Sequence, residues 1–166
     1  MANSKSSHRL SNTIGTFTGT VDDKPITATT VFAGTANEMV YVEFDEEANE
    51  NLTSIMFHLS AAFYDEPQPV TVQMTNKRLY AYFRDNRGLR RPVVDGELHI
   101  NMNREDETYT GHFDNLVFGL YDDPTDKVTI SGKFTLKGHT DPFEDKSGSF
   151  PQKDFLQKDY PRTLLK

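Results

Sequence analysis

The chain contains no cysteine and no tryptophan among its 166 residues. Without cysteine it forms no disulfide bond, and cysteine nucleophiles and cysteine-ligated metals are excluded. No apolar run approaches the about 20 residues needed to cross a bilayer, so we expect no membrane span. The first residues, Met1–Arg9, are not followed by the apolar stretch of a signal peptide. Together these absences predict a cytoplasmic protein.

Three widespread site motifs are missing as well: the Gly-x-Ser-x-Gly nucleophile elbow, the P-loop and the Gly-x-Gly-x-x-Gly nucleotide loop. With no catalytic or cofactor signature, we predict that the protein is not an enzyme and binds no cofactor. Basic residues are outnumbered, 18 Lys and Arg against 25 Asp and Glu, which gives a net charge of -7. A domain that binds double-stranded nucleic acid has a basic face or a high pI, so this partner is not expected.

The sequence does contain apolar and polar residues that alternate along most of the stretch from Thr13 to Lys137. A period of two is typical of β-strands with one face in the core, and the Thr and Val content of these runs favours a pleated surface. Each run is bounded by Gly, Pro, Asn or Asp, which favour turns. The expected strands are Ile14–Val21, Ile26–Phe32, Met39–Phe44, Val70–Met74, Leu79–Phe83, Glu97–Met102, Tyr109–Leu120 and Val128–Lys137.

The stretch Leu52–Tyr64 fits two periodicities. Ile55, Phe57 and Leu59 share one face of a strand, whereas Ile55, Leu59 and Phe63 share one face of a helix. We favour a strand, because Phe57 lies off the helical face and the neighbouring elements are strands. The whole series predicts an all-β domain of about eight or nine antiparallel strands, arranged as a β-sandwich or as a closed β-barrel.

The two ends of the chain differ in composition from this β domain, which covers residues 13–137. Residues 1–12 are polar and are expected to form a flexible segment. Residues 138–166 are rich in Asp, Lys, Pro and Gly with spaced aromatics, and we expect an irregular tail. We favour a tail packed on the domain, and a tail that is free or binds a partner is the alternative.

The alternation changes phase once, inside Tyr109–Leu120. Tyr109 and Phe113 share one parity, whereas Leu116 and Phe118 have the other. A β-bulge near residues 114–115 would turn both sets toward the core, because a bulge inserts one extra residue into a strand.

The pattern Gly-x-Phe occurs four times, and residues two apart share one face of a strand. Glycine leaves space beside each ring, which an aromatic ring of a neighbouring strand can fill. We interpret the pattern as packing at bent strands, and the alternative is a ligand cavity with Phe17, Phe113 and Phe134 in its wall. The four copies are Gly15-Thr16-Phe17, Gly111-His112-Phe113, Gly132-Lys133-Phe134 and Gly148-Ser149-Phe150.

One predicted hairpin brings potential metal ligands together. If the loop Asn103–Thr108 closes symmetrically, His99 lies opposite His112, with Cβ atoms about 4.5–5.5 Å apart. The same register places Glu97 opposite Asp114. Two imidazoles and two carboxylates on one face form a plausible ligand set for zinc or a similar divalent ion. The alternative is a solvated polar face that holds no ion.

The loop from Arg84 to Pro92 contains four arginines within eight residues of an acidic protein. Arginine recognises carboxylate and phosphate groups through paired hydrogen bonds. Because aromatic residues precede the loop, this segment could contact an acidic protein, a lipid headgroup or single-stranded nucleic acid. The alternative is that the arginines pair with carboxylates of the domain itself. The candidate partner-binding residues are Arg84, Arg87, Arg90, Arg91, Tyr80 and Tyr82.

These patterns lead us to expect a non-catalytic binding module whose partner is another protein, like a small acidic inhibitor or adaptor. Two alternatives remain open. One is a carrier of small hydrophobic ligands with a β-barrel cavity. The other is a divalent-metal-binding protein or metal-dependent enzyme that uses His99 and His112.

Overall fold

A computed structural model describes residues 10–141, which form eleven antiparallel strands and one short 3-10 helix. The prediction of an all-β antiparallel domain is confirmed, with eleven strands in place of eight or nine. The elements are β1 (Ile14–Val21), β2 (Lys24–Thr27), β3 (Thr30–Ala36), β4 (Met39–Ala48), β5 (Asn51–Ser60), η2 (Ala61–Asp65), β6 (Val70–Gln73), β7 (Leu79–Arg84), β8 (Arg90–Asp95), β9 (Glu97–Asn103), β10 (Thr108–Gly119) and β11 (Lys127–Lys137).

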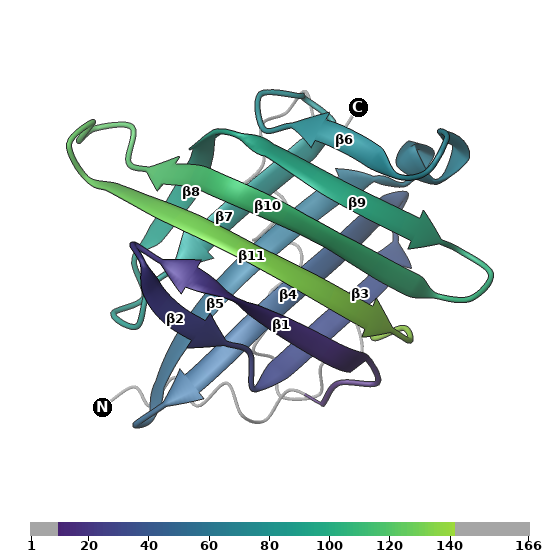
Figure 1. Ribbon diagram of the computed structural model, residues 1–166, viewed down its shortest axis with the longest axis horizontal. Coiled ribbons are helices and arrows are strands. Elements are labelled where there is room, and N and C mark those ends of the chain that lie inside the picture. The colour runs from purple at the N-terminus through teal and green to yellow at the C-terminus, as the bar shows by residue number, and fades with distance from the viewer. Residues whose placement is uncertain (1–9, 142–166) are drawn as a thin grey trace.

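The strands form two curled layers that face each other, and the strands of one layer cross those of the other (Figure 1). Layer A contains, in spatial order, β2, β1, β11, β10, β9 and β6, and layer B contains β8, β7, β5, β4 and β3. β8 joins the layers, because it pairs with β7 and also with β10 at Val117 and Phe118. Within the described chain the path of paired strands ends at β2 and at β3, which do not pair with each other, so the sheet is a half-barrel.

Apolar side chains from both layers fill the space between them. Phe17, Phe113 and Phe134 of layer A pack against Phe44 and Phe57 of layer B. The rings of Phe17 and Phe44 are stacked with their centroids 4.3 Å apart. Rings of this size bury a large apolar area, so this cluster is a main source of stability.

The opposite face of layer B is also buried. Phe32, Tyr41, Met56 and Tyr82 point away from the core by strand alternation, yet each is at most 4% exposed. β4 and β5 therefore carry buried residues at consecutive positions. This two-sided burial explains why residues 52–64 fit more than one periodicity.

The strand prediction for residues 52–64 is confirmed up to Ser60, and the remainder is corrected. β5 ends at Ser60, and Ala61–Asp65 form the 3-10 helix η2. The Ser60 hydroxyl accepts a hydrogen bond from the backbone N–H of Ala62 at 3.2 Å, which caps the helix start. Phe63 stays buried in the core from its helical position.

The single strand predicted over Ile26–Phe32 is instead split into β2 and β3, which lie in different layers. The chain crosses between the layers at Ala28 and Thr29. The backbone N–H and the hydroxyl of Thr29 both donate to the carbonyl of Asp45, at 2.8 and 3.1 Å. These hydrogen bonds satisfy backbone groups where the chain crosses between the layers. Apolar and polar residues alternate across residues 26–29 in the sequence, although the strand itself is interrupted there.

The loop predicted from Arg84 to Pro92 is wrong at both ends. Arg84 is the last residue of β7, and residues 90–92 begin β8, so the connection covers only residues 85–89. Pro92 pairs with Tyr82 inside the strand. Proline and consecutive charged residues normally indicate a loop, so the sequence did not predict this short strand.

The predicted β-bulge in β10 is confirmed. The pairing of β10 with β11 shifts register between Phe113 and Leu116. Asn115 takes a positive φ of 56° there, a conformation that asparagine tolerates better than most residues. Both Phe113 and Leu116 are consequently buried in the core.

Thr13, which follows the predicted N-terminal segment, and Thr140, which lies at the start of the predicted tail, both bond to the edge of β3. The hydroxyl of Thr13 accepts from the N–H of Ala33 at 3.0 Å, and the N–H of Thr140 donates to the Ala33 carbonyl at 2.8 Å. The rest of the predicted N-terminal segment and tail, residues 1–9 and 142–166, lies outside the described residues. From residue 10 to residue 141 no helix has the length and apolar character needed to cross a membrane.

Candidate functional site

Arg91, a predicted partner-binding residue, is engaged inside the molecule. Its side chain is 6% exposed. Nε and Nη2 donate to the carboxylate of Asp126 at 2.7 and 3.2 Å, and Nη1 donates to Asp85 at 2.9 Å. Arg87 also donates to Asp85, at 3.0 Å, but its side chain is 72% exposed. These two arginines pair with carboxylates of the domain itself, which favours the alternative interpretation of this segment.

Asp85 shows the electrostatic effect of this pairing. Burial alone would raise the pKa of its carboxyl. Hydrogen bonds from Arg91 and Arg87 and from the backbone N–H groups of Leu89 and Arg87 outweigh burial, and they lower the pKa of Asp85 to about 2. The carboxylate therefore binds its partners as an anion throughout the neutral and mildly acidic range.

Asp85→Asn is expected to lower the free energy of unfolding by about 2 kcal/mol at pH 7, since a pKa unit corresponds to ~1.4 kcal/mol. The folded-state pKa lies below the unfolded value of about 4, so this stabilisation is complete above pH ~4 and is lost between pH ~4 and ~2. Urea denaturation of both proteins at several pH values measures it. A difference that stays constant down to pH 2 would contradict the assignment.

The other four candidates of the arginine segment lie on β7 and β8 at the outer face of layer B. The guanidinium carbon of Arg90 lies 5.1 Å from the ring centroid of Tyr82, a cation–π distance. The rings of Tyr80 and Tyr82 are 5.9 Å apart. Arg84, Arg90 and Tyr80 are half-buried, and Tyr82 is buried. Arg90, Tyr80 and Tyr82 therefore pack against one another at this face.

The three residues predicted to line a cavity occupy the gaps left by glycines. Gly111 pairs with Phe134, and Gly132 pairs with Phe113, across β10 and β11. A Cβ placed on Gly132 would lie 2.4 Å from Cε1 of Phe17 and 3.2 Å from Cζ of Phe113. Rings therefore fill the volume beside Gly111 and Gly132, which supports the packing interpretation for these two copies of Gly-x-Phe. Backbone atoms of Thr135 and Leu136 occupy the space beside Gly15, and the copy at residues 148–150 lies outside the described residues.

The predicted hairpin register is confirmed at the two histidines. His99 pairs with His112 across β9 and β10, and their rings stack with centroids 4.7 Å apart. Nε2 of His99 lies 3.0 Å from Glu97 Oε1, and Nδ1 lies 3.0 Å from the Thr71 hydroxyl. The predicted pairing of Glu97 with Asp114 is wrong, because the pairing of β9 with β10 ends at His99 and His112 and Glu97 pairs with Gln73 of β6. Between residues 10 and 141, no three His, Cys, Asp or Glu form a group that could hold a metal ion.

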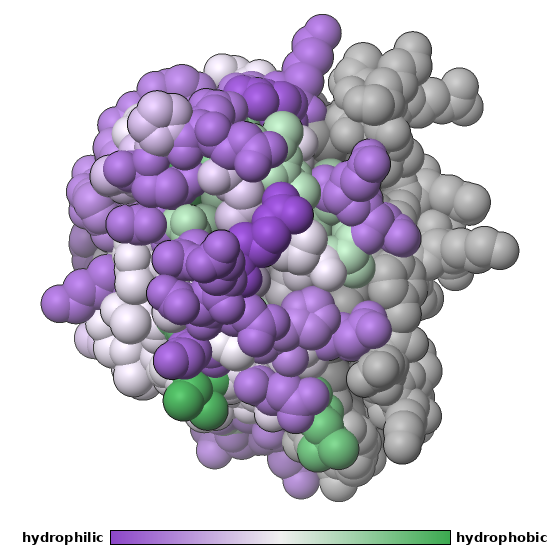
Figure 2. All heavy atoms as spheres, turned by 90° about the vertical axis from the view of Figure 1, so that its right-hand side faces the viewer, coloured by the Kyte–Doolittle hydropathy of each residue, from purple (hydrophilic) through white to green (hydrophobic). Residues whose placement is uncertain are grey.

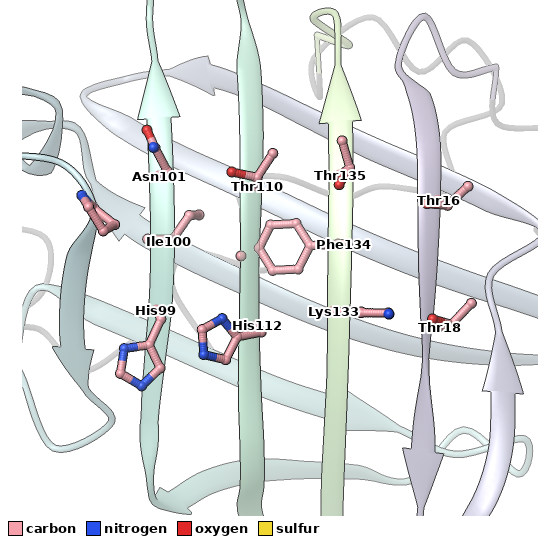
Figure 3. A pocket seen from close by; sticks show the side chains of 12 residues that line it. Thr16, Thr18, His99, Ile100, Asn101, Thr110, His112, Lys133, Phe134 and Thr135 are labelled. Carbon is pink, nitrogen blue, oxygen red and sulfur yellow. The ribbon is translucent and has the colours of Figure 1, made fainter.

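A groove of about 730 Å³ lies on the outer face of layer A, across β9, β10, β11 and β1. Its volume is within the range of ligand-binding sites, about 300–1,000 Å³. Gly111 has no side chain to fill the centre, so the buried residues Ile100 and Phe134 reach the groove floor beside Pro69. Figure 3 shows Ile100 and Phe134 between the polar side chains that surround them.

The polar side chains of this groove form two rows across the strands (Figure 3). We call this surface the threonine face. Because the strands pair in register, each row runs perpendicular to them, with neighbouring strands about 4.8 Å apart. The first row is Thr16, Thr135, Thr110 and Asn101, and the second row is Thr18, Lys133, His112 and His99.

Sequence reasoning identified His99 and His112 but missed the other polar residues of the threonine face. Thr16 and Thr18 were visible as alternating threonines in the first strand, and Lys133 lies between Gly132 and Phe134 of a motif interpreted only as packing. The missing information was strand order. β1 lies beside β11, more than 100 residues later in the chain, and no local pattern predicts that pairing.

No protein-family model matches this chain, and a search of curated protein sequences returns no match either.

Proposed function

We propose that this domain is a non-catalytic binding module that holds a protein partner against the threonine face. The observation that carries the proposal is the groove of about 730 Å³, whose central donors, Lys133 and His112, make no hydrogen bond or ion pair with another described side chain. The arginine segment supports it less, because Arg91 and Arg87 are already bound to carboxylates of the domain.

The chemistry of the groove fits binding better than catalysis. Its lining within residues 10–141 includes no serine, aspartate or glutamate. A pair of carboxylates is therefore not present there. Within the described residues, the threonine hydroxyls of the lining make no hydrogen bond to His99 or His112, so no hydroxyl is paired with a base. His99 is held at both ring nitrogens by Glu97 and Thr71, so its ring is fixed in place. Hydroxyl, amide and imidazole groups in rows suit hydrogen bonds to a docked ligand.

The size and polarity of the surface fit a protein partner. Six strands of layer A at about 4.8 Å spacing make a face about 24 Å across, enough for the ~800 Å² that one partner contributes to a standard interface. The side of the molecule that carries the β9–β10 turn is mostly hydrophilic, with apolar side chains only in small patches (Figure 2). That side lies at right angles to the threonine face (Figure 1). On the threonine face itself, threonine, asparagine, histidine and lysine surround Pro69, Ile100 and Phe134, so recognition would depend on polar contacts around a small apolar floor.

The proposal predicts that filling the groove abolishes binding. The probes are three eight-residue peptides of alternating glycine with glutamate, glutamine or lysine, added to the ¹⁵N-labelled full chain. At least one peptide is expected to shift the amide signals of Thr110, Lys133 and Thr135 saturably and to be recovered chemically unchanged. Thr110→Trp places a bulky ring in the groove and should remove the shifts.

Thr75→Trp is the matched control, because Thr75 is exposed in a turn outside the groove. It should bind like the unaltered protein. If no peptide shifts the groove signals, or if Thr110→Trp binds as well as Thr75→Trp, the threonine face is not the binding surface.

A further inference from the structure

We infer that the groove on the threonine face takes an acidic peptide segment, with carboxylate side chains held by Lys133 and His112. This inference rests on the proposed function and adds the chemical class of the partner. The first observation is the charge of the side chains that line the groove. The groove is lined by one lysine and two histidines and, within the described residues, by no carboxylate. The whole chain carries a net charge of -7, so the groove has the opposite local character to the protein around it.

The two donors of the proposed site, Lys133 and His112, lie side by side. Lys133 pairs with His112 across β11 and β10, and with Thr18 across β11 and β1. Directly opposed Cβ atoms are about 4.5–5.5 Å apart, so one carboxylate can accept hydrogen bonds from both neighbours of a row. Both Lys133 and His112 are exposed, so a ligand reaches them without displacing other side chains.

The carboxylates on the neighbouring strand positions do not neutralise these donors. Asp114, two residues after His112 on β10, makes no hydrogen bond or ion pair with Lys133 or His112 in the described part of the chain. Glu97 lies outside the groove lining, two residues before His99 on β9, and its Oε1 is 3.0 Å from His99 Nε2 while its Oε2 accepts from Gln73 Nε2 at 2.7 Å. Both of its oxygens are therefore occupied away from Lys133. The ring of His99 stacks on the ring of His112 with centroids 4.7 Å apart, and this contact restricts the orientation of the His112 ring.

The other row of the threonine face favours an extended segment over a free small anion. Thr16, Thr135, Thr110 and Asn101 offer hydroxyl and amide groups along the whole groove, parallel to the row that contains Lys133. Such groups donate to and accept from the amides of an extended backbone. The floor of Pro69, Ile100 and Phe134 adds apolar contact between the rows. A peptide can use all three features at once.

Binding is measured by titrating the full chain with the glycine–glutamate peptide, the isosteric glycine–glutamine peptide and inorganic phosphate. Only the glutamate peptide is expected to saturate, with a Kd of about 1 mM or lower, and 0.5 M NaCl should weaken it several-fold. Lys133→Gln should weaken binding about 10-fold, because a hydrogen bond between charged groups is lost. Lys127→Gln, on the same strand but outside the groove, should leave the Kd unchanged.

The outcomes separate this inference from the proposed function. If the glutamine peptide binds equally well and Lys133→Gln has no effect, the acidic partner is ruled out while the binding module stands. If phosphate saturates the groove and the peptides do not, the site takes a small anion and the inference is overturned. If no probe shifts the groove signals, the inference and the proposed function both fail.

Discussion

Replacing Arg91 by methionine is expected to lower the free energy of unfolding by about 3 kcal/mol at pH 7. Methionine fills a similar volume but leaves two carboxylates without their guanidinium. Asp126 loses two hydrogen bonds and Asp85 loses one, at a site where the arginine side chain is only 6% exposed. The expected loss of stability is at the lower end of the range for a broken buried ion pair, because the Asp126 side chain is 29% exposed.

Arg87→Met is the matched control for this experiment. Arg87 donates to the same carboxylate of Asp85 at 3.0 Å, but its side chain is 72% exposed. Solvent screens such a pair, so the change should cost about 0.5 kcal/mol or less. Urea denaturation followed by circular dichroism gives both values. Equal losses for the two variants would show that the buried bridge between the β7–β8 connection and the β10–β11 connection adds nothing specific.

Gly132→Ala is expected to destabilise the domain by about 3 kcal/mol, although it adds one methyl group. The new Cβ would lie 2.4 and 2.6 Å from Cε1 and Cζ of Phe17. The Phe17 ring has no free direction, because it is stacked on Phe44 at 4.3 Å and lies 6.0 Å from Phe113. Either the ring leaves its rotamer or the strands separate, and both cost packing energy.

Phe17→Leu tests whether that clash is the cause. A smaller side chain at position 17 should recover at least about 1 kcal/mol in the Gly132→Ala background, so the two changes should not be additive. Gly119→Ala serves as the control, because the nearest atom to its Cβ would be 3.3 Å away. Additive losses for Gly132→Ala and Phe17→Leu would mean that the ring and the glycine do not compete for space.

The strands and the hairpin register could be predicted because they depend on local patterns. Alternation gave most strand positions, the change of parity in Tyr109–Leu120 indicated the bulge, and a six-residue loop was enough to place His99 opposite His112. β8 was missed because Arg90, Arg91 and Pro92 resemble a loop in sequence. In the structure the buried Arg91 is paired with Asp85 and with Asp126, and Asp126 is 35 residues away in the chain.

The candidate site could be predicted only in part, for the same reason. Which face each residue occupies follows from its parity, so Thr16, Thr110 and Lys133 could be assigned outward positions. Their grouping depends on the order β1, β11, β10, β9, which joins the first strand to the last. Long-range pairing of this kind arises from the packing of the whole core and leaves no signature in a short window of sequence.

On β10 and β11, a glycine of each strand pairs with a phenylalanine of the other, and this pairing also specifies how the two strands align. The connection between them, residues 120–126, is too long to set the alignment by turn geometry. A shift of two residues in one direction would bring Phe113 opposite Phe134, and a shift in the other would bring Gly111 opposite Gly132. The first crowds two rings into one place and the second opens a hole between the layers. A register shift in either direction therefore lowers the stability of the β10–β11 hairpin. Core packing specifies the correct pairing of the two strands without a contribution from the loop.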